Sequence, residues 1–217
     1  MSKIIDYVLR NNNEILNFTL EHIQLVGIAT IIAILIGVPL GIYLTTNEYL
    51  AESILRIASI IMTIPSLALF GMMIPILSLI GQGIGFLPAL IALVLYSQLP
   101  IIRNTYTGIK DVNPNVRDAA KAIGMSTIQR LVKVEIPIAM PLIMTGIRLA
   151  TVMNIGIGAI AAFIGAGGLG VLINQGISRS NSTMVIVGAV AVSIMAIMAD
   201  LLLKYIQKRF TVKGINS

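Results

Sequence analysis

Long apolar stretches alternate with short polar segments along this chain. Four stretches contain no Asp, Glu, Lys or Arg: residues 22–47, 57–102, 149–178 and 180–199. A helix needs about 20 predominantly apolar residues to cross a bilayer. The second stretch is long enough for two crossings, with Gly81-Gln82-Gly83 as the turn between them. The pattern therefore predicts five membrane-spanning helices, near residues 23–45, 57–80, 84–102, 141–165 and 183–204.

A polar segment, residues 113–137, separates the third and fourth predicted spans. Asn113 followed by Pro114 is typical of a helix start, because an Asn side chain caps free backbone N–H groups and proline fits the first helical turn. Apolar residues then recur at helical spacing and form one stripe, made of Val116, Ala119, Ala120 and Ile123. The pattern predicts a short amphipathic helix.

A second short helix is predicted in the same segment. Gly124 can adopt the left-handed conformation that ends the first helix. Ser126 with Gln129 three residues later has the pattern of a capping box, so the second helix is expected to begin there and to end at Pro137. The outward faces are expected to carry the charged residues Arg117, Asp118, Lys121, Arg130 and Lys133. Such a pair of helices is either a docking surface for another protein or a connector that packs on the chain's own membrane helices.

The composition agrees with a membrane protein. Of the 217 residues, 57% are hydrophobic and 11% are charged, and the mean hydropathy is +0.95. We therefore expect an all-α polytopic membrane protein with a single transmembrane domain, residues 1–217. The net charge of +6 does not indicate a nucleic acid partner, because the basic residues lie between the predicted spans, beside membrane lipid.

The basic residues divide unevenly between the two sides of five spans. Three lie on the side of the amino terminus: Lys3, Arg10 and Arg179. Twelve lie on the other side: Arg56, the seven basic residues from Arg103 to Arg148, Lys204, Lys208, Arg209 and Lys213. Loops rich in Lys and Arg stay in the cytoplasm. This distribution predicts an outer amino terminus, an inner carboxy terminus and a cytoplasmic segment 113–137.

Several single residues modify this picture. His22, the only histidine, is expected to be a polar residue at the outer edge of the first span rather than a pH sensor or a ligand. Gly37 and Gly41 are four residues apart, a spacing that permits close helix packing. Pro141 is expected to restart a helix after the polar segment, and Arg148 to extend its side chain to the inner membrane interface. Residues 1–20 are expected to form a tail or a surface-lying helix.

Residues 165–170 contain four glycines in six positions, and so many glycines destabilise a regular helix. Two interpretations remain: a hinge or wall of a transport path, or a plain outer loop. The polar residues Ser66, Ser97 and Gln98 have a similar ambiguity, because they either line such a path or hydrogen-bond neighbouring helices.

The polar segment resembles the EAA loop of ABC-importer permeases. That loop has the pattern Glu-Ala-Ala, three residues, Gly, nine residues, Ile, one residue, Leu-Pro. Here Asp118-Ala119-Ala120, Gly124, Val134 and Ile136-Pro137 stand at the same spacing. The departures, Asp for Glu, Val for Ile and Ile for Leu, keep charge or apolar character. The resemblance implies that the segment is a coupling helix, held in a groove of a cytoplasmic ATPase.

Three further stretches are similar to the permeases for glycine betaine, carnitine and choline, the Opu type. They are TIPSLAL at residues 63–69, YSQLPIIRNTYTGI at 96–109 and AAFIGAGGLG at 161–170. The resemblance implies a transport subunit rather than an enzyme, in a bacterial cell membrane, that imports osmoprotectants under osmotic stress. It also implies an ABC ATPase partner, an extracellular substrate-binding protein and a second permease, either the same chain or a sister chain.

The site residues that this resemblance implies fall into two groups. Coupling to the ATPase is expected from Asp118, Ala119, Ala120, Gly124 and Pro137. The translocation path is expected to include Pro65, Ser66, Tyr96, Ser97, Gln98, Asn154, Phe163 and Gly165. No cofactor is expected in this chain; ATP and Mg²⁺ are expected on the partner, because no G-x-x-x-x-G-K-[ST] phosphate loop occurs in the sequence.

Two alternatives stand beside the osmoprotectant importer. One is a permease for another small solute, such as an amino acid. The other, of a different class, is an ion-coupled secondary transporter. Ion coupling usually needs an acidic residue within the membrane, and the first four predicted spans contain none, while Asp200 is expected at the inner end of the fifth.

Overall fold

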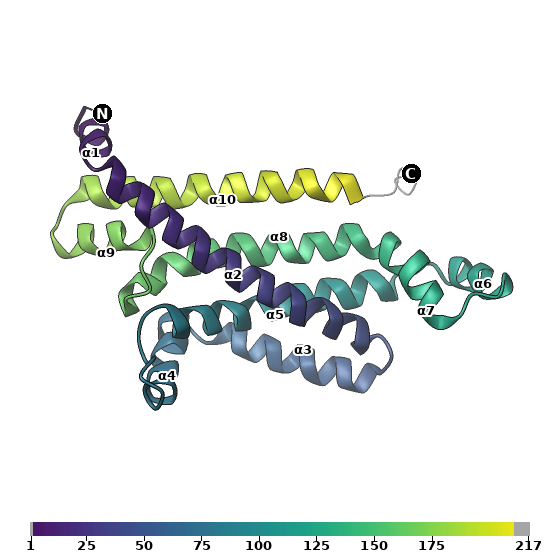
Figure 1. Ribbon diagram of the computed structural model, residues 1–217. Coiled ribbons are helices and arrows are strands. Elements are labelled where there is room, and N and C mark those ends of the chain that lie inside the picture. The colour runs from purple at the N-terminus through teal and green to yellow at the C-terminus, as the bar shows by residue number, and fades with distance from the viewer. Residues whose placement is uncertain (1, 211–217) are drawn as a thin grey trace.

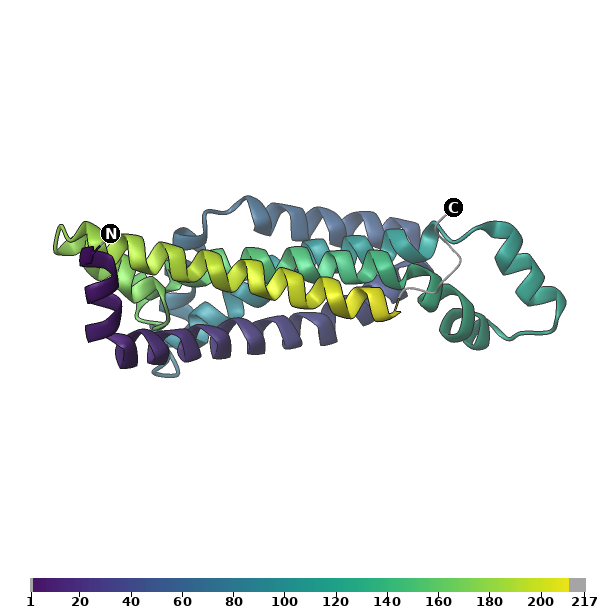
Figure 2. The same ribbon diagram turned by 90° about the horizontal axis from the view of Figure 1, so that it is seen from above.

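The computed structural model describes residues 2–210, which form helices joined by short turns and contain no strand (Figure 1). Four helical stretches are long and apolar enough to cross a membrane, and a bent helix pair is a candidate for a fifth crossing. The all-helical architecture with four to five candidate spans is therefore confirmed. The elongated elements that run side by side are α2 (Asn12–Leu44), α3 (Glu48–Thr63), α5 (Phe86–Lys110), α8 (Ile136–Ile160) and α10 (Ser182–Phe210) (Figure 2).

The amino-terminal part is more helical than expected. A short amphipathic helix, α1 (Ser2–Arg10), is followed directly by α2, which begins at Asn12 rather than near residue 23. The polar residues 12–20 thus extend the first long helix beyond its apolar part. This extension is stabilised by Ile15 and Phe18, which pack against a buried apolar cluster. The cluster consists of Leu169, Leu172, Met184 and Val187.

The predicted second span, residues 57–80, is broken into two helices. α3 ends at Thr63 and α4 (Ser66–Ser78) begins after a break of two residues, and the two helix axes are bent by 101°. Pro65 causes the break, because proline has no N–H and disfavours helical backbone in the preceding residue. Ile64 accordingly has an extended backbone with ψ of 128°. Residues 48–56, between the first two predicted spans, are also helical and form the first part of α3. Asn47 caps this helix, since its Oδ1 accepts a 3.1 Å bond from the Leu50 N–H.

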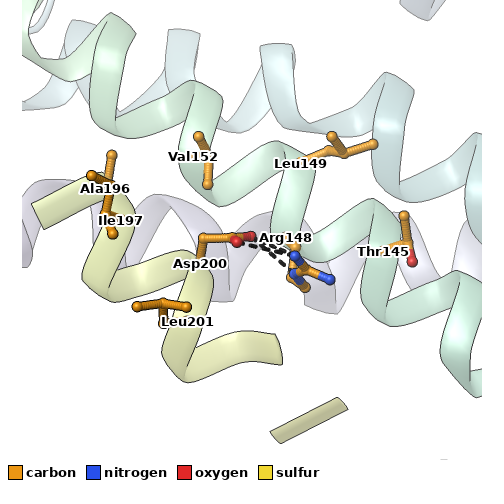
Figure 3. Close-up of a pocket in the computed structure, with 8 residues that line it drawn as sticks. All are labelled: Thr145, Arg148, Leu149, Val152, Ala196, Ile197, Asp200 and Leu201. Carbon is orange, nitrogen blue, oxygen red and sulfur yellow. Dashed lines mark hydrogen bonds and ion pairs between the residues drawn. The ribbon is translucent and has the colours of Figure 1, made fainter. Parts of the chain in front are cut away.

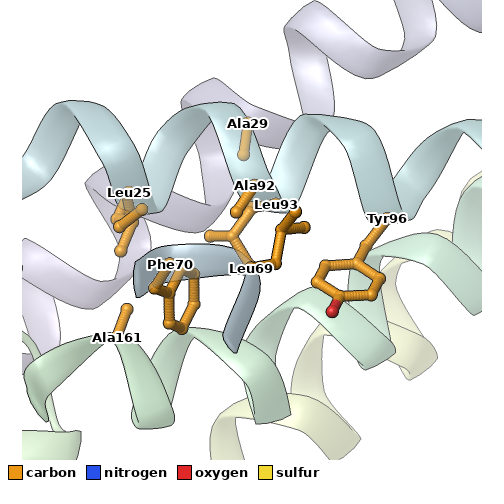
Figure 4. Packing of buried hydrophobic residues seen from close by; sticks show 9 residues of the cluster. Leu25, Ala29, Leu69, Phe70, Ala92, Leu93, Tyr96 and Ala161 are labelled. Carbon is orange, nitrogen blue, oxygen red and sulfur yellow. The ribbon is translucent and has the colours of Figure 1, made fainter. Parts of the chain in front are cut away.

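The core lies where α2, α4, α5 and the end of α8 meet (Figure 4). Phe70 of α4 is fully buried there, between Leu25 of α2 and Ala161. Farther along, α2 crosses α5 closely at two glycines: a Cβ at Gly37 would lie 2.8 Å from Ile101 Cγ2, and one at Gly41 would lie 2.7 Å from Thr105 Cβ. The packing role of this glycine pair is therefore confirmed.

Short helices mark the two ends of the bundle. α6 (Pro114–Ala122) and α7 (Thr127–Arg130) project beyond one end, where α10 also ends. α1 and α9 (Gly170–Ser178) lie at the opposite end, so residues 2 and 210 lie at opposite ends of the molecule. Lys213, counted above with the inner basic residues, lies outside the described residues.

Candidate functional site: the projecting segment and the polar centre of the bundle

The projecting segment, residues 113–137, folds as its cap residues predict. Asn113 Oδ1 accepts a 2.9 Å hydrogen bond from the Asn115 N–H, and Pro114 lies in the first turn of α6. Gly124 has a left-handed backbone with φ of 82°. Ser126 and Gln129 form both bonds of the capping box, at 2.9 and 3.3 Å. Local side-chain chemistry therefore determines the helix–glycine–helix shape.

The second helix does not end at Pro137, contrary to the prediction. α7 continues through one turn of π-helix, η1 (Leu131–Glu135), into α8, so residues 127–164 form one helical rod. A proline inside an α-helix removes one hydrogen bond and crowds the carbonyl four residues before it. The wider π turn directly before Pro137 accommodates this defect. Pro141 likewise lies inside α8 and does not restart a helix.

The apolar stripe of the projecting segment is largely uncovered. Its two large side chains, Val116 and Ile123, are 38% and 74% exposed. Two apolar side chains after Gly124, Ile128 and Val132, are also exposed, by 74% and 56%. Ala119 is also exposed, whereas Ala120 faces the chain itself and is 5% exposed. An apolar surface at the tip of a polar projection is typical of an interaction site. The arrangement favours the docking-surface interpretation over a connector packed on its own membrane helices.

Two of the basic residues expected on the outward face instead turn inward. Glu135, 6% exposed, accepts a 2.7 Å bond from Arg130 Nε, and Arg117 Nε lies 3.4 Å from the same carboxylate oxygen. Arg117 Nη2 also donates to the Ile109 carbonyl at the end of α5. A buried carboxylate needs such partners. The cluster therefore fastens α6 and α7 to the end of the bundle, while Asp118 and Lys121 form an exposed pair at 3.0 Å.

The candidate path residues Tyr96, Pro65 and Ser66 meet at the break between α3 and α4. Tyr96, 3% exposed, donates its hydroxyl hydrogen to the Ile64 carbonyl, which the break leaves without a helical partner. Pro65 is exposed and Ser66 half-buried. A tyrosine hydroxyl buried in an apolar core needs such an acceptor. Tyr96 thus connects α5 to the bend.

Ser97 and Asn154 meet across the α5–α8 contact, and both are fully buried. Asn154 Nδ2 donates to Ser97 Oγ at 2.7 Å, and Ser97 Oγ donates to the Leu93 carbonyl at 2.8 Å. Gln98 Nε2 donates to the Val94 carbonyl at 3.1 Å. Among residues 2–210, neither Asn154 Oδ1 nor Gln98 Oε1 has a hydrogen-bond partner. The Asn154–Ser97 bond joins α5 to α8, whereas the bonds of Ser97 and Gln98 to backbone carbonyls stay within α5. The two open carbonyl oxygens mark the polar centre of the bundle.

The glycine turn, residues 165–169, packs against the amino-terminal half of α2. Gly168 N–H donates to Glu21 Oε2 at 2.8 Å, and the Ile164 carbonyl accepts from the Gly85 N–H at 2.8 Å. His22, expected at an interface, is instead 1% exposed, with Nε2 at 3.1 Å from the Ile155 carbonyl. The glycines permit this approach, because a Cβ at Gly168 would lie 3.1 Å from His22 Nδ1. The candidate path residues Phe163 and Gly165 are exposed here, at the opposite end of the bundle from the projecting segment.

Arg148 pairs with Asp200 across the α8–α10 contact (Figure 3). Its Nε and Nη2 donate to Asp200 Oδ1 at 3.0 and 2.8 Å, and Nη1 donates to Gln207 Oε1 at 2.9 Å. Asp200 lies within α10, which continues to Phe210. Neither this pair nor the roles of Glu21 and Glu135 were predicted from the sequence. The sequence feature that could have indicated the Arg148–Asp200 pair is charge, because the two residues carry opposite charges at the edges of long uncharged stretches.

Comparison with known proteins relates these features to a family. Residues 16–212 match the family described as "Binding-protein-dependent transport system inner membrane component". The chain is similar to the osmoprotectant import permease protein OsmW of Salmonella typhimurium, with 51% identity over 98% of this chain and 99% of the relative. It is also similar to the choline transport system permease protein OpuBB of Bacillus subtilis, with 43% identity over 100% of this chain and 97% of the relative.

The fold is similar to that of solved ABC transporters. The methionine transporter MetNI in an inward-facing conformation gives a TM-score of 0.81 at 22% identity, over 91% of this chain and 96% of that chain. An amino acid ABC transporter gives a TM-score of 0.77 at 19% identity, over 94% of this chain and 97% of that chain. At these identities the likeness concerns the fold alone.

Proposed function

The chain belongs to the family of binding-protein-dependent transport system inner membrane components, and from this premise we propose that it is the permease subunit of an ATP-driven importer for osmoprotectants. The proposed substrates are glycine betaine, carnitine, choline or similar quaternary amines. The observation that carries the proposal is the 51% identity, over nearly the whole chain, to an osmoprotectant import permease.

The proposed arrangement has the amino terminus outside and the projecting segment in the cytoplasm. The excess of Lys and Arg at the end of the bundle with the projecting segment supports this orientation. Counting the bent pair α3–α4 as one crossing makes five spans, which puts the two termini on opposite sides of the membrane. ATP and Mg²⁺ would bind to the partner ATPase, a second permease would complete the path, and a binding protein would deliver substrate from outside.

The helical rod, residues 127–164, suggests how the partner would drive transport. Its cytoplasmic end carries the docking surface, its middle carries Asn154 of the polar centre, and its far end leads into the glycine turn. A tilt imposed by the ATPase on one end of a continuous helix moves the whole helix, whereas the glycine turn can absorb the change in backbone angles. Asp118, Ala119, Ala120 and Gly124 are the proposed contacts with the ATPase.

Co-purification followed by reconstitution tests the proposed function. The chain, expressed with its neighbouring subunits and purified in mild detergent, is expected to retain an ATPase and a binding protein. In proteoliposomes this complex is expected to accumulate labelled glycine betaine, carnitine or choline only with ATP on the ATPase side. Uptake that continued without ATP but stopped with a collapsed ion gradient would indicate a secondary transporter. Uptake of methionine or histidine alone would indicate an amino acid permease.

Single-cysteine labelling is expected to confirm the orientation. The natural chain contains no cysteine, so one introduced residue reports one position. Ser126→Cys, at the exposed start of α7, should react with a membrane-impermeant maleimide only after the membrane is made permeable. Ser180→Cys, in the turn between α9 and α10, should react in intact cells. The reverse pattern would refute the cytoplasmic position of the projecting segment.

A further inference from the structure

The Arg148–Asp200 ion pair lies in a groove between α8 and α10 (Figure 3). The groove has a volume of about 410 Å³, and its remaining walls are mostly apolar, formed by Thr145, Leu149, Val152, Ala196, Ile197 and Leu201. The pair has both a bidentate geometry and a third partner in Gln207, which also donates to the Pro141 carbonyl at 2.7 Å. It is the most extensively hydrogen-bonded ion pair among the described residues.

The position of this ion pair along α8 and α10 limits what can cover its exposed side. At about 1.5 Å per helical residue, Arg148 lies about 18 Å from the start of α8 at Ile136, and Asp200 about 15 Å from the end of α10. Both positions lie within helical stretches, Thr127–Ile164 and Ser182–Arg209, that are long and apolar enough to cross a membrane. The side chains nevertheless remain 22% and 37% exposed on the surface of this chain.

Lipid is an unfavourable cover for these charges. Ionisable groups within a membrane almost always face protein or a water-filled cavity, because hydrocarbon cannot solvate them. The rest of the groove is apolar, so a protein cover would have to bury the open side of the pair without any matching charge from this chain. Water, by contrast, solvates the exposed side of the pair without a matching charge, which favours an aqueous path beside the groove.

We propose that this groove is a substrate-contact site of the translocation path, which binds solutes that carry both a quaternary ammonium and a carboxylate. The inference rests on the proposed function and assigns two residues to it. Arg148 would donate to the solute carboxylate, since its guanidinium has five N–H donors and its four contacts within residues 2–210 leave part of Nη1 available. Asp200 would face the ammonium, whose methyl groups would contact the apolar walls.

Neighbouring leucines of α10 provide a matched test of the groove. Leu201 lines the groove and is 59% exposed, whereas Leu202 is 61% exposed and does not line it. In the reconstituted complex, Leu201→Cys is expected to react with a methanethiosulfonate reagent that carries a trimethylammonium group. Leu202→Cys, of the same residue type and at nearly the same depth, is expected to react at least about tenfold more slowly, because lipid excludes the charged reagent.

Protection by solutes identifies the ligand. Glycine betaine, which has both charges, is expected to slow the labelling of Leu201→Cys about tenfold, the effect of one charge-assisted hydrogen bond. Choline, which lacks the carboxylate, is expected to protect clearly less. In the neutral double variant Arg148→Gln/Asp200→Asn, which leaves no unpaired charge, the two solutes should protect equally. The exposed pair Glu52 and Arg56 of α3, changed to Gln in the same way, serves as the control and should leave the difference intact.

Three results would overturn the proposal: no labelling of Leu201→Cys, labelling that neither solute slows, or equal protection by both solutes in the unchanged pair. Failure of the proposed function would look different. In that case the unmodified complex would take up no quaternary amine at all, whereas failure of the groove alone would leave its uptake normal.

Discussion

Replacement of Ala119 by arginine is expected to abolish ATP-driven uptake while the chain remains inserted in the membrane. Ala119 is an exposed small residue in the centre of the apolar stripe, beside Val116 and Ile123. An arginine there would have to be buried, without a partner, in the contact with the ATPase. An uncompensated buried charge costs about 3–5 kcal/mol, which corresponds to a loss of binding of about 100-fold or more. Uptake of labelled glycine betaine and retention of the ATPase during purification measure the effect.

Ser53→Arg provides the matched control for this variant. Ser53 is a small exposed residue of α3 at the same end of the bundle, but outside the projecting segment. Its replacement should leave both uptake and ATPase retention unchanged. Ala120→Arg is less informative, because Ala120 is 5% exposed and a large side chain there would disturb the packing of α6 itself. Normal uptake by the Ala119→Arg variant would show that this face of α6 does not contact the ATPase.

Replacement of Gly170 by alanine is expected to prevent stable folding. A Cβ at this position would lie 1.9 Å from the Ala159 carbonyl oxygen and 2.6 Å from its carbonyl carbon, so relief requires a shift of backbone rather than of a side chain. Overpacking of this kind costs about 3 kcal/mol, or more where the backbone cannot move. We expect little protein to be recovered in monodisperse form, with a clearly lower melting temperature in detergent.

Gly156→Ala is the control for this second effect. Gly156 lies in α8 with an exposed surface, and a Cβ added there would meet no neighbouring group within 4 Å. Alanine is favoured over glycine in a helix by about 1 kcal/mol, so this variant should melt at the same or a slightly higher temperature. Equal melting temperatures for Gly170→Ala and the natural chain would show that the turn between η2 (Ala161–Ile164) and α9 is not closely packed against α8.

The sequence was most informative where neighbouring residues determine structure. Asn113, Gly124 and the pair Ser126–Gln129 define the caps of the projecting segment, because each acts on backbone groups within three residues of itself. The spacing of Gly37 and Gly41 correctly indicated a close helix contact, although it did not say with which helix. The resemblance of the motif spacing to the EAA loop indicated the family, which the comparisons then confirmed.

Local patterns were least reliable at prolines and at charged residues. At Pro65 the axes of α3 and α4 are bent by 101°, whereas Pro137 and Pro141 lie within one continuous helical rod. Only the π turn before Pro137 and the packing of the helices distinguish these cases. Arg117 and Arg130 were expected on the outward face of the projecting segment because charges usually stay in water. Both instead lie beside the carboxylate of Glu135. The pairing of Arg148 with Asp200, 52 residues later, was not predicted from the sequence.

By itself, the sequence determined that this chain is a helical membrane protein, which segment projects from it, and how that segment is capped. These properties depend on the hydropathy of about 20 consecutive residues and on hydrogen bonds within one turn. Only the tertiary structure decided that Arg148 meets Asp200, that Asn154 meets Ser97, and that His22 is buried against the glycine turn. The physical reason is that a charge or an amide satisfies itself with whichever partner the packing of distant helices brings within about 3 Å, and no local pattern records that distance.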